Sequence, residues 1–186
     1  MQKDSTWRRP KQTIGSITIT ILENLFAAAE MVGEYNIRRF QAHETIRRIE
    51  HLSCKKNSSR WINDLRTRGY IKIDRSKNEI VSIVFTNKAK MKIVDTIAKS
   101  IKQDQIFRFI SFDIPETMRD RRNKFRSAIK KMGFLQIQQS LWVINRDVSE
   151  LVEAAAYEYG VEKYITYIVS AKSDIDGIIA KKFSVQ

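Results

Sequence analysis

The chain has 186 residues, of which 42% are hydrophobic, and a formal net charge of +13 at pH 7. This apolar content excludes an intrinsically disordered chain, and no apolar run approaches the roughly 20 residues that cross a bilayer. The polar N-terminus lacks the apolar stretch of a signal peptide, and Cys54 is the single cysteine, so we expect a cytoplasmic protein with no membrane partner and no internal disulfide.

The positive charge is concentrated in the first part of the chain. Residues 1–104 hold 21 Lys and Arg against 11 Asp and Glu, a net charge of +10, whereas residues 105–186 hold 13 against 10. A basic half joined to a nearly neutral half indicates a polyanion-binding module followed by a module of another kind. The alternative is a solvated basic surface. The basic arm at residues 1–14 is expected to be disordered or to act as a phosphate-contacting tail.

Two helices are expected at the start of the first domain, which we place at residues 15–103. Apolar residues recur at helical spacing over residues 17–32 and again over roughly 40–52. Phe40 is expected on the inward face of the second helix. Residues 53–57 then form a short turn that leads to the next helix.

A short basic helix is expected at residues 60–68, ending at Gly69. Its apolar residues Trp61, Ile62 and Leu65 fall on one face. The opposite face and its flanks carry the polar residues Arg60, Asn63, Arg66, Thr67 and Arg68. One face is therefore expected to pack inward and the other to remain available to a partner.

A hairpin follows this helix, with strands at 70–73 and 80–85 around a polar tip at 74–78. Thr86 then caps a last helix at 87–101. Helix, helix, turn, short basic helix, basic-tipped hairpin and helix is the element order of a winged helix-turn-helix domain. The alternative is a helical bundle that docks proteins.

The chemistry of this domain fits double-stranded DNA as its partner. Arginine pairs bidentately with guanine and asparagine with adenine in the major groove, and a helix N-terminus can meet a phosphate. A basic hairpin tip can reach neighbouring phosphates or the minor groove. The predicted DNA-contacting residues are Ser58, Ser59, Arg60, Asn63, Arg66, Thr67, Arg68, Lys72, Arg75 and Lys77.

The second domain, residues 104–186, fits the order β-α-β-β-α-β of a ferredoxin-like fold, so the whole chain is expected to be α+β. The expected elements are a strand at 106–112, a helix at 116–132, a hairpin of 134–139 with 141–145, a helix at 148–159 and a strand at 164–170. One face of such a sheet is open and is a natural surface for a homodimer. An amphipathic tail helix at 173–183 is expected to pack across that dimer or back onto the sheet.

Four segments of this domain resemble one known family: Phe112-Asp113-Ile114-Pro115-Glu116, Arg119-Asp120-Arg121-Arg122, Met132-Gly133-Phe134 and Gln138-Gln139-Ser140-Leu141-Trp142-Val143. They are similar to the ferredoxin-like domain of the PaaX repressor family, which is shared with the small CRISPR-associated nuclease that partners the spacer integrase. The resemblance implies a transcriptional repressor that binds palindromic operator DNA as a dimer. PaaX-type proteins continue into a third domain, whereas this sequence stops after one further helix, so the family's acyl-CoA effector is not carried over.

Asp113 separates two functional hypotheses. In the CRISPR-associated nuclease the matching aspartate faces its twin across the dimer axis, and such a carboxylate pair can hold Mg²⁺ for phosphodiester hydrolysis. Asp113 is thus the one candidate catalytic and metal-binding residue, and Mg²⁺ the one cofactor that the nuclease alternative requires. The structural alternative is that Asp113 caps the helix starting at Pro115. A third hypothesis is an adaptor that binds the spacer integrase or another protein.

Other chemistry is absent from the sequence pattern. His43, His51 and Cys54 do not match zinc-ligand spacing. No glycine-rich phosphate loop or hydrolase motif occurs. The arginines of the helix that follows Pro115 are expected to form a solvated or ion-paired face rather than a second DNA surface. We therefore expect a DNA-binding regulator without a cofactor.

Overall fold

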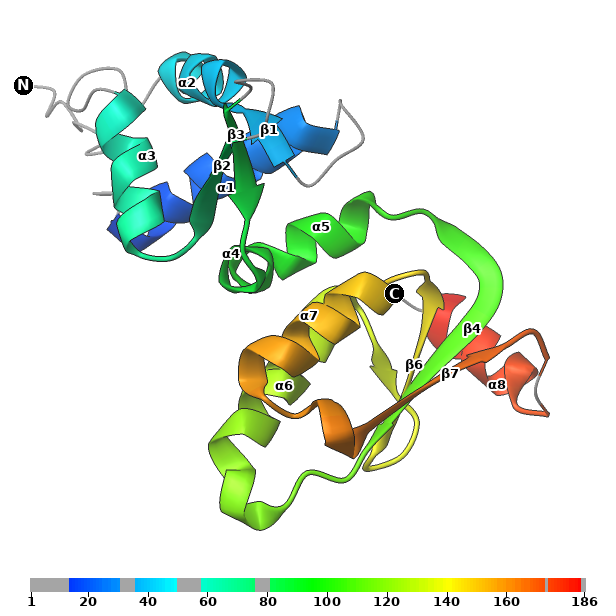
Figure 1. Ribbon diagram of the computed structural model, residues 1–186. Coiled ribbons are helices and arrows are strands. Elements are labelled where there is room, and N and C mark those ends of the chain that lie inside the picture. The colour runs from blue at the N-terminus through cyan, green and yellow to red at the C-terminus, as the bar shows by residue number, and fades with distance from the viewer. Residues whose placement is uncertain (1–13, 31–35, 50–57, 76–80, 173, 185–186) are drawn as a thin grey trace, which may run out of the picture. The chain divides into compact units, whose positions relative to one another are not determined.

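The computed structural model (Figure 1) describes residues 14–30, 36–49, 58–75, 81–172 and 174–184. It divides into two compact units, the first made of Met1–Arg68 with Ile73–Val84 and the second of Gly69–Lys72 with Phe85–Gln186. Both contain helices and antiparallel strands, which confirms the predicted α+β class. Within the described ranges, no helix is both long and apolar enough to cross a lipid bilayer.

The first unit contains the helices and the hairpin that the sequence predicts. Its elements are α1 (Ile14–Glu30), β1 (Asn36–Arg38), α2 (Arg39–Arg48), α3 (Ser58–Thr67), β2 (Ile71–Arg75) and β3 (Val81–Phe85), although the first two residues of β2 and the last residue of β3 are grouped with the second unit. The strand β1 was not predicted, because three residues are too few to show an alternating pattern. It pairs antiparallel with β3, which lies between β1 and β2.

The core of the first unit is built from one side of each helix. α1 buries residues spaced three and four apart, and α3 buries its predicted apolar face. The buried residues of these two helices are Ile21, Leu22, Leu25, Phe26, Ala29, Trp61, Ile62 and Leu65. The prediction for Phe40 is wrong, because its side chain is 71% exposed. It lies in the first turn of α2, ahead of the buried Ala42 and Ile46.

The segment after the hairpin differs from the single helix predicted at 87–101. It forms α4 (Asn87–Lys92) and α5 (Val94–Ser100), separated at Ile93. Thr86 caps α4 as expected, since its hydroxyl accepts from the backbone N–H of Ala89 at 3.3 Å. α4 packs against the helix α7 (Ser149–Tyr159), and α5 against α6 (Arg119–Met132). The second unit therefore includes a segment that the sequence assigned to the first domain.

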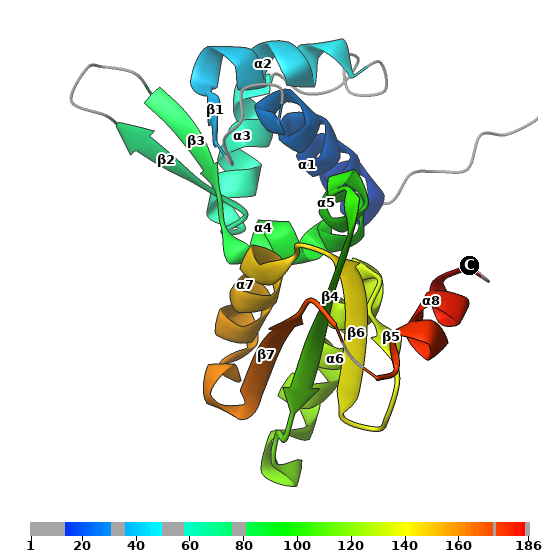
Figure 2. The same cartoon turned by 90° about the vertical axis from the view of Figure 1, so that its right-hand side faces the viewer.

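The second unit shows the predicted β-α-β-β-α-β order. Its further elements are β4 (Gln103–Phe112), the 3-10 turn η1 (Glu116–Met118), β5 (Leu135–Gln136), β6 (Leu141–Arg146), the 3-10 turn η2 (Glu162–Tyr164), β7 (Ile165–Ser170) and α8 (Asp176–Ser184). The sheet order is β5-β6-β4-β7 and every recorded pairing is antiparallel. β7 lies at one end of the sheet (Figure 2).

The two faces of this sheet are covered differently. Successive residues of β4 point to opposite faces. On one face Phe112 meets Phe125 of α6 edge to face, with ring centroids 5.5 Å apart. On the other face Phe109 packs with Val143 and with the fully buried Ile179 of α8.

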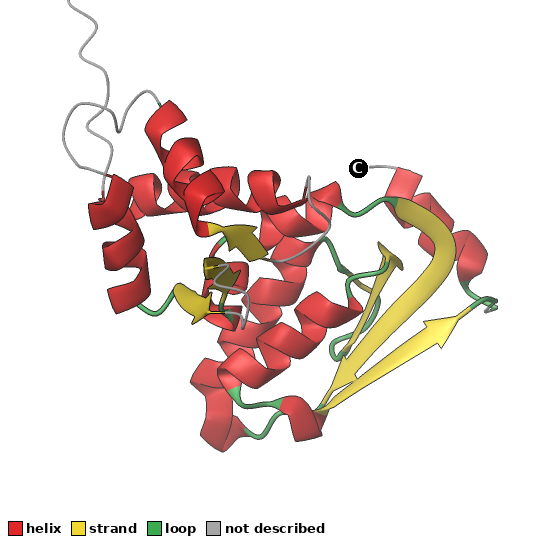
Figure 3. Ribbon diagram, turned by 45° about the horizontal axis from the view of Figure 1, so that its top comes forward, coloured by secondary structure: helices red, strands yellow, loops and turns green. Residues whose placement is uncertain are grey.

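α8 therefore occupies part of the sheet face that the sequence left open. Phe183 stacks on Phe107 with ring centroids 6.3 Å apart, and Lys182 donates to the carbonyl of Gln136 at 3.2 Å. Figure 3 shows the strands between the helices α6 and α7 on one side and α8 on the other. Of the two alternatives for the tail, the structure shows packing back onto its own sheet. Residue 173, where the predicted tail helix begins, lies outside the described residues.

Candidate nucleic-acid interface

α3 presents an exposed polar face next to its buried one. Trp61, Ile62 and Leu65 are buried. The exposed residues are Ser59, Arg60, Asn63, Arg66 and Thr67. Because these positions lie three, four and seven apart, most of them share one side of the helix. Five of the ten predicted contact residues are thus brought together on a single helix surface.

Two of these residues are already joined in the free protein. Arg66 donates from Nη2 to Oδ1 of Asn63 at 2.8 Å. An amide oxygen has two lone pairs, so Asn63 Oδ1 keeps one acceptor site and its amide nitrogen keeps both donors. The bond orients the asparagine while leaving it able to meet an adenine edge in bidentate fashion.

Ser58 is placed differently from the expectation that it meets a phosphate. It is only 5% exposed, and its hydroxyl lies 2.9 Å from Nδ1 of His43 in α2. Burial, followed by the charges of Arg39 and Arg47, lowers the pKa of His43. The imidazole is therefore neutral at pH 7, and the pair connects the two helices instead of facing a partner.

Arg68 also lies away from the exposed face of α3. Its guanidinium forms an ion pair with Asp64 at 3.1 Å and donates to the hydroxyl of Thr18 in α1 at 3.4 Å. The residue therefore ties the end of α3 to α1. Helical spacing identified it as a flanking residue, but it could not reveal a partner fifty positions earlier in the chain.

The hairpin residues are described in part. Lys72 is exposed on β2, as a phosphate-contacting lysine requires. Arg75 ends the same strand, but its side chain and the whole of Lys77 lie outside the described residues, as does the arm 1–13. Lys72 and the cations of α3 are thus the described basic residues of the prediction whose side chains are exposed.

Asp113 is exposed at the end of β4, where its backbone N–H donates to the carbonyl of Tyr164 at 3.0 Å. It lines a polar surface pocket of about 460 Å³ together with Glu116, Arg122 and Arg126. The capping interpretation is wrong, because neither η1 nor α6 has a side-chain cap.

The pocket gives little support to a nuclease within one chain. Glu116 is engaged with Arg122 at 2.6 Å and with Arg119 at 3.7 Å. Across the part of the chain that the structure describes, no group of three His, Cys, Asp or Glu side chains is placed to hold a metal ion. Among the residues that line this pocket, Asp113 therefore has no second carboxylate that is free of arginine contacts.

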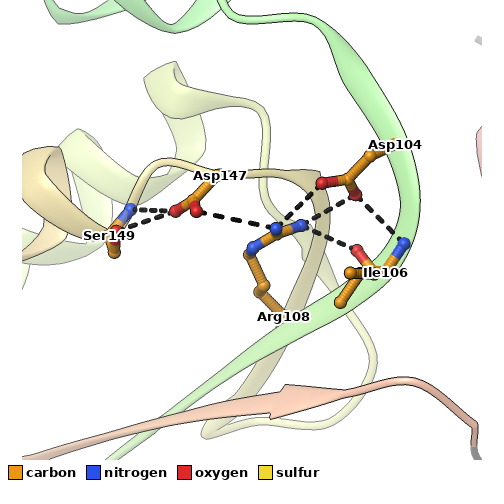
Figure 4. Close-up of polar contacts among 5 residues, drawn as sticks. All are labelled: Asp104, Ile106, Arg108, Asp147 and Ser149. Atoms are coloured by element: carbon orange, nitrogen blue, oxygen red, sulfur yellow. Dashed lines mark hydrogen bonds and ion pairs between the residues drawn. The ribbon is translucent and has the colours of Figure 1, made fainter.

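β4 contains a buried cation that the sequence pattern did not predict (Figure 4). Arg108 is 5% exposed and donates from both terminal nitrogens to the carboxylate of Asp104, each at 2.8 Å. It also donates to the carbonyl of Ile106 at 2.9 Å and lies 3.7 Å from the carboxylate of Asp147. The sequence signal for this buried cation is a single arginine inside the apolar run Phe107–Phe112.

The contacts of this cluster shift the pKa values of its members. Hydrogen bonds from Arg108 lower the pKa of Asp104 below its usual 3.8, and hydrogen bonds from Ser149 lower that of Asp147. Burial, with the charge of Asp147, raises the pKa of Tyr167 to about 12. Two carboxylates thus compensate the one buried guanidinium, and the cluster joins the start of β4 to the start of α7.

The architecture around this cluster defines the class of the second unit: four antiparallel strands in β-α-β-β-α-β order, with both helices on one face. Residues 101–178 match the family model described as the PaaX protein central Cas2-like domain. This match confirms the predicted resemblance of this part of the chain to the PaaX-like family. The match does not extend to the first unit. No curated protein and no solved structure matches the chain.

Proposed function

We propose that the protein is a dimeric, sequence-specific DNA-binding transcriptional regulator, a repressor that reads a palindromic operator. The observation that carries the proposal is the exposed face of α3, where Arg60, Asn63, Arg66 and Thr67 stand together above a buried apolar face. Arginine, asparagine and threonine are residue types whose side chains form specific hydrogen bonds to base edges in the major groove.

The arrangement of the first unit supports a winged-helix interpretation. Two helices and a short strand precede α3, and a two-stranded hairpin follows it, with the sheet order β1-β3-β2. In a winged helix the third helix enters the major groove and the hairpin contacts the adjacent backbone. Lys72 on β2 is exposed for that second task.

The charge distribution and the family match point in the same direction. The excess of positive charge in residues 1–104 suits a polyanion. The match of residues 101–178 to the PaaX central Cas2-like domain suggests a regulator. We infer that the basic first half binds DNA and that the PaaX-like second half regulates this binding.

Selection of duplexes from a random pool by the purified full-length protein tests this function. We expect an inverted repeat whose half-sites lie one or two helical turns apart. We also expect log K to fall steeply and linearly with log salt concentration, because bound phosphates release counterions. A pool with no enriched sequence after selection would contradict the proposal. The nuclease alternative is tested in parallel by incubating the selected duplex and Mg²⁺ with the wild type or with the Asp113→Asn variant. That alternative requires cleavage by the wild type and its loss in the variant.

A further inference from the structure

β7 leaves one edge of the Cas2-like sheet unpaired in the described structure. Its six residues pair with β4 in continuous register, from Ser170 opposite Phe107 to Ile165 opposite Phe112. The strand ends the sheet, and no other described backbone group bonds to its outer edge. A row of backbone donors and acceptors is therefore open to a further strand.

This edge carries none of the devices that normally prevent strand addition. Such edges are usually interrupted by lysine, proline or a bulge. The sequence Ile165-Thr166-Tyr167-Ile168-Val169-Ser170 has no charge and no proline, and its pairing with β4 has no register shift. Ile168 is 45% exposed and Val169 60% exposed. Since adjacent residues point to opposite faces, apolar surface is present on both sides of the edge.

The remaining borders of the same sheet are already protected. The opposite edge strand, β5, has only two residues. α8 covers the middle of the open face through Ile179 and Phe183. β7 is thus the long, unprotected border of this sheet.

We propose that β7 pairs antiparallel with β7 of a second copy of this chain, around a two-fold axis, to give a continuous eight-stranded sheet. This interface rests on the dimer of the proposed function and specifies where that dimer forms. A two-fold axis makes a single edge complementary to itself, because the donors of one copy meet the acceptors of the other.

Charge also favours a second copy as the occupant. Residues 105–186 are nearly neutral, with 13 Lys and Arg against 10 Asp and Glu, and β7 itself is uncharged, so two copies can meet along this edge without net charge repulsion. The charges at each end of the strand cancel, because Glu162 and Lys163 precede it and Lys172 and Asp174 follow it. Antiparallel pairing therefore brings together two neutral ends.

The test is the oligomeric state of full-length Val169→Lys by sedimentation velocity over a concentration series. Val169 is largely exposed in one chain, so a lysine there leaves the fold intact but places charge on the edge. We expect the wild type to be a dimer and the variant to dissociate with a dissociation constant raised about tenfold or more. The matched control is Ile178→Lys, which puts the same charge on an apolar residue of α8 that is 58% exposed and should leave the dimer unchanged.

Hydrogen exchange supplies a second readout that does not depend on a variant. The outward amides of Ile165–Ser170 should be protected at high protein concentration and exposed on dilution. The interface would be overturned if Val169→Lys dimerised like the wild type, or if both lysine variants lost the dimer equally. Amide protection of Ile165–Ser170 that did not change with protein concentration would also overturn it. A monomeric wild type, or one whose β7 pairs only after another protein is added, would also overturn it. A monomeric wild type would also contradict the dimer of the proposed function, whereas each of the other results leaves duplex selection by α3 unchanged, so failure of the β7 interface and failure of the proposed function are distinguishable.

Discussion

Replacing Asp104 with alanine is expected to lower the free energy of unfolding of the second unit by about 2–3 kcal/mol at pH 7. Removing one partner of a buried ion pair costs about 3–5 kcal/mol because the remaining charge is left uncompensated. The figure here is smaller because Asp104 is 39% exposed and because Asp147 still lies 3.7 Å from Arg108. Urea unfolding followed by circular dichroism measures the difference.

The ion pair of Asp104 with Arg108 makes the free energy of unfolding depend on pH. The pKa of Asp104 is lowered in the folded state, so its contribution is complete above its usual pKa near 4 and is lost as the pH falls below that value. The gap between wild type and Asp104→Ala should hold from pH 7 to pH 5 and shrink below about pH 4. Asp174→Ala, at an exposed position, is the control. An Asp104→Ala variant as stable as this control would show that the buried arginine does not depend on its carboxylate.

Replacing Ile179 with alanine is expected to cost about 2–4 kcal/mol and to release α8 from the sheet. Its side chain is fully buried against Phe109 and Val143, and truncation leaves a cavity. A helix of nine residues is too short to persist without tertiary packing. Hydrogen exchange of α8 and of the strands beneath it should report the release.

The neighbouring residue gives a closely matched control for this effect. Ile178→Ala makes the same chemical change in the same helix, at a side chain that is 58% exposed. It should alter the free energy of unfolding by less than about 0.5 kcal/mol. Equal effects of the two substitutions would mean that α8 does not dock through Ile179.

The sequence predicted the elements better than their contacts. The amphipathic spacing of α3 correctly separated Trp61, Ile62 and Leu65 from the polar residues. It did not show that Ser58 turns towards His43 or that Arg68 reaches Thr18, because such contacts join distant parts of the chain. A periodic pattern gives the face of a helix and not the partner that covers it.

The same limit explains the placement of the last helices and of the charges. The apolar residues of α4 and α5 indicate a buried face, yet only the fold shows that α7 and α6 bury it. Likewise Arg108 stands in an apolar strand; Asp104 lies four residues earlier in the same strand, whereas Asp147 follows the distant strand β6. Phe40 is the converse case: it lies within the helix that the sequence predicts, yet its apolar side chain is exposed.

The central claim is that the exposed face of α3 reads base sequence, and a comparison of Arg60→Ala with Lys72→Ala tests it most directly. Affinities for the selected duplex and for a random duplex are measured by fluorescence anisotropy over a range of salt concentrations. Arg60→Ala should weaken the selected duplex by about 1–3 kcal/mol and the random duplex far less. Lys72→Ala should weaken both alike and reduce the salt slope by about one. Equal losses on both duplexes for Arg60→Ala would contradict the claim.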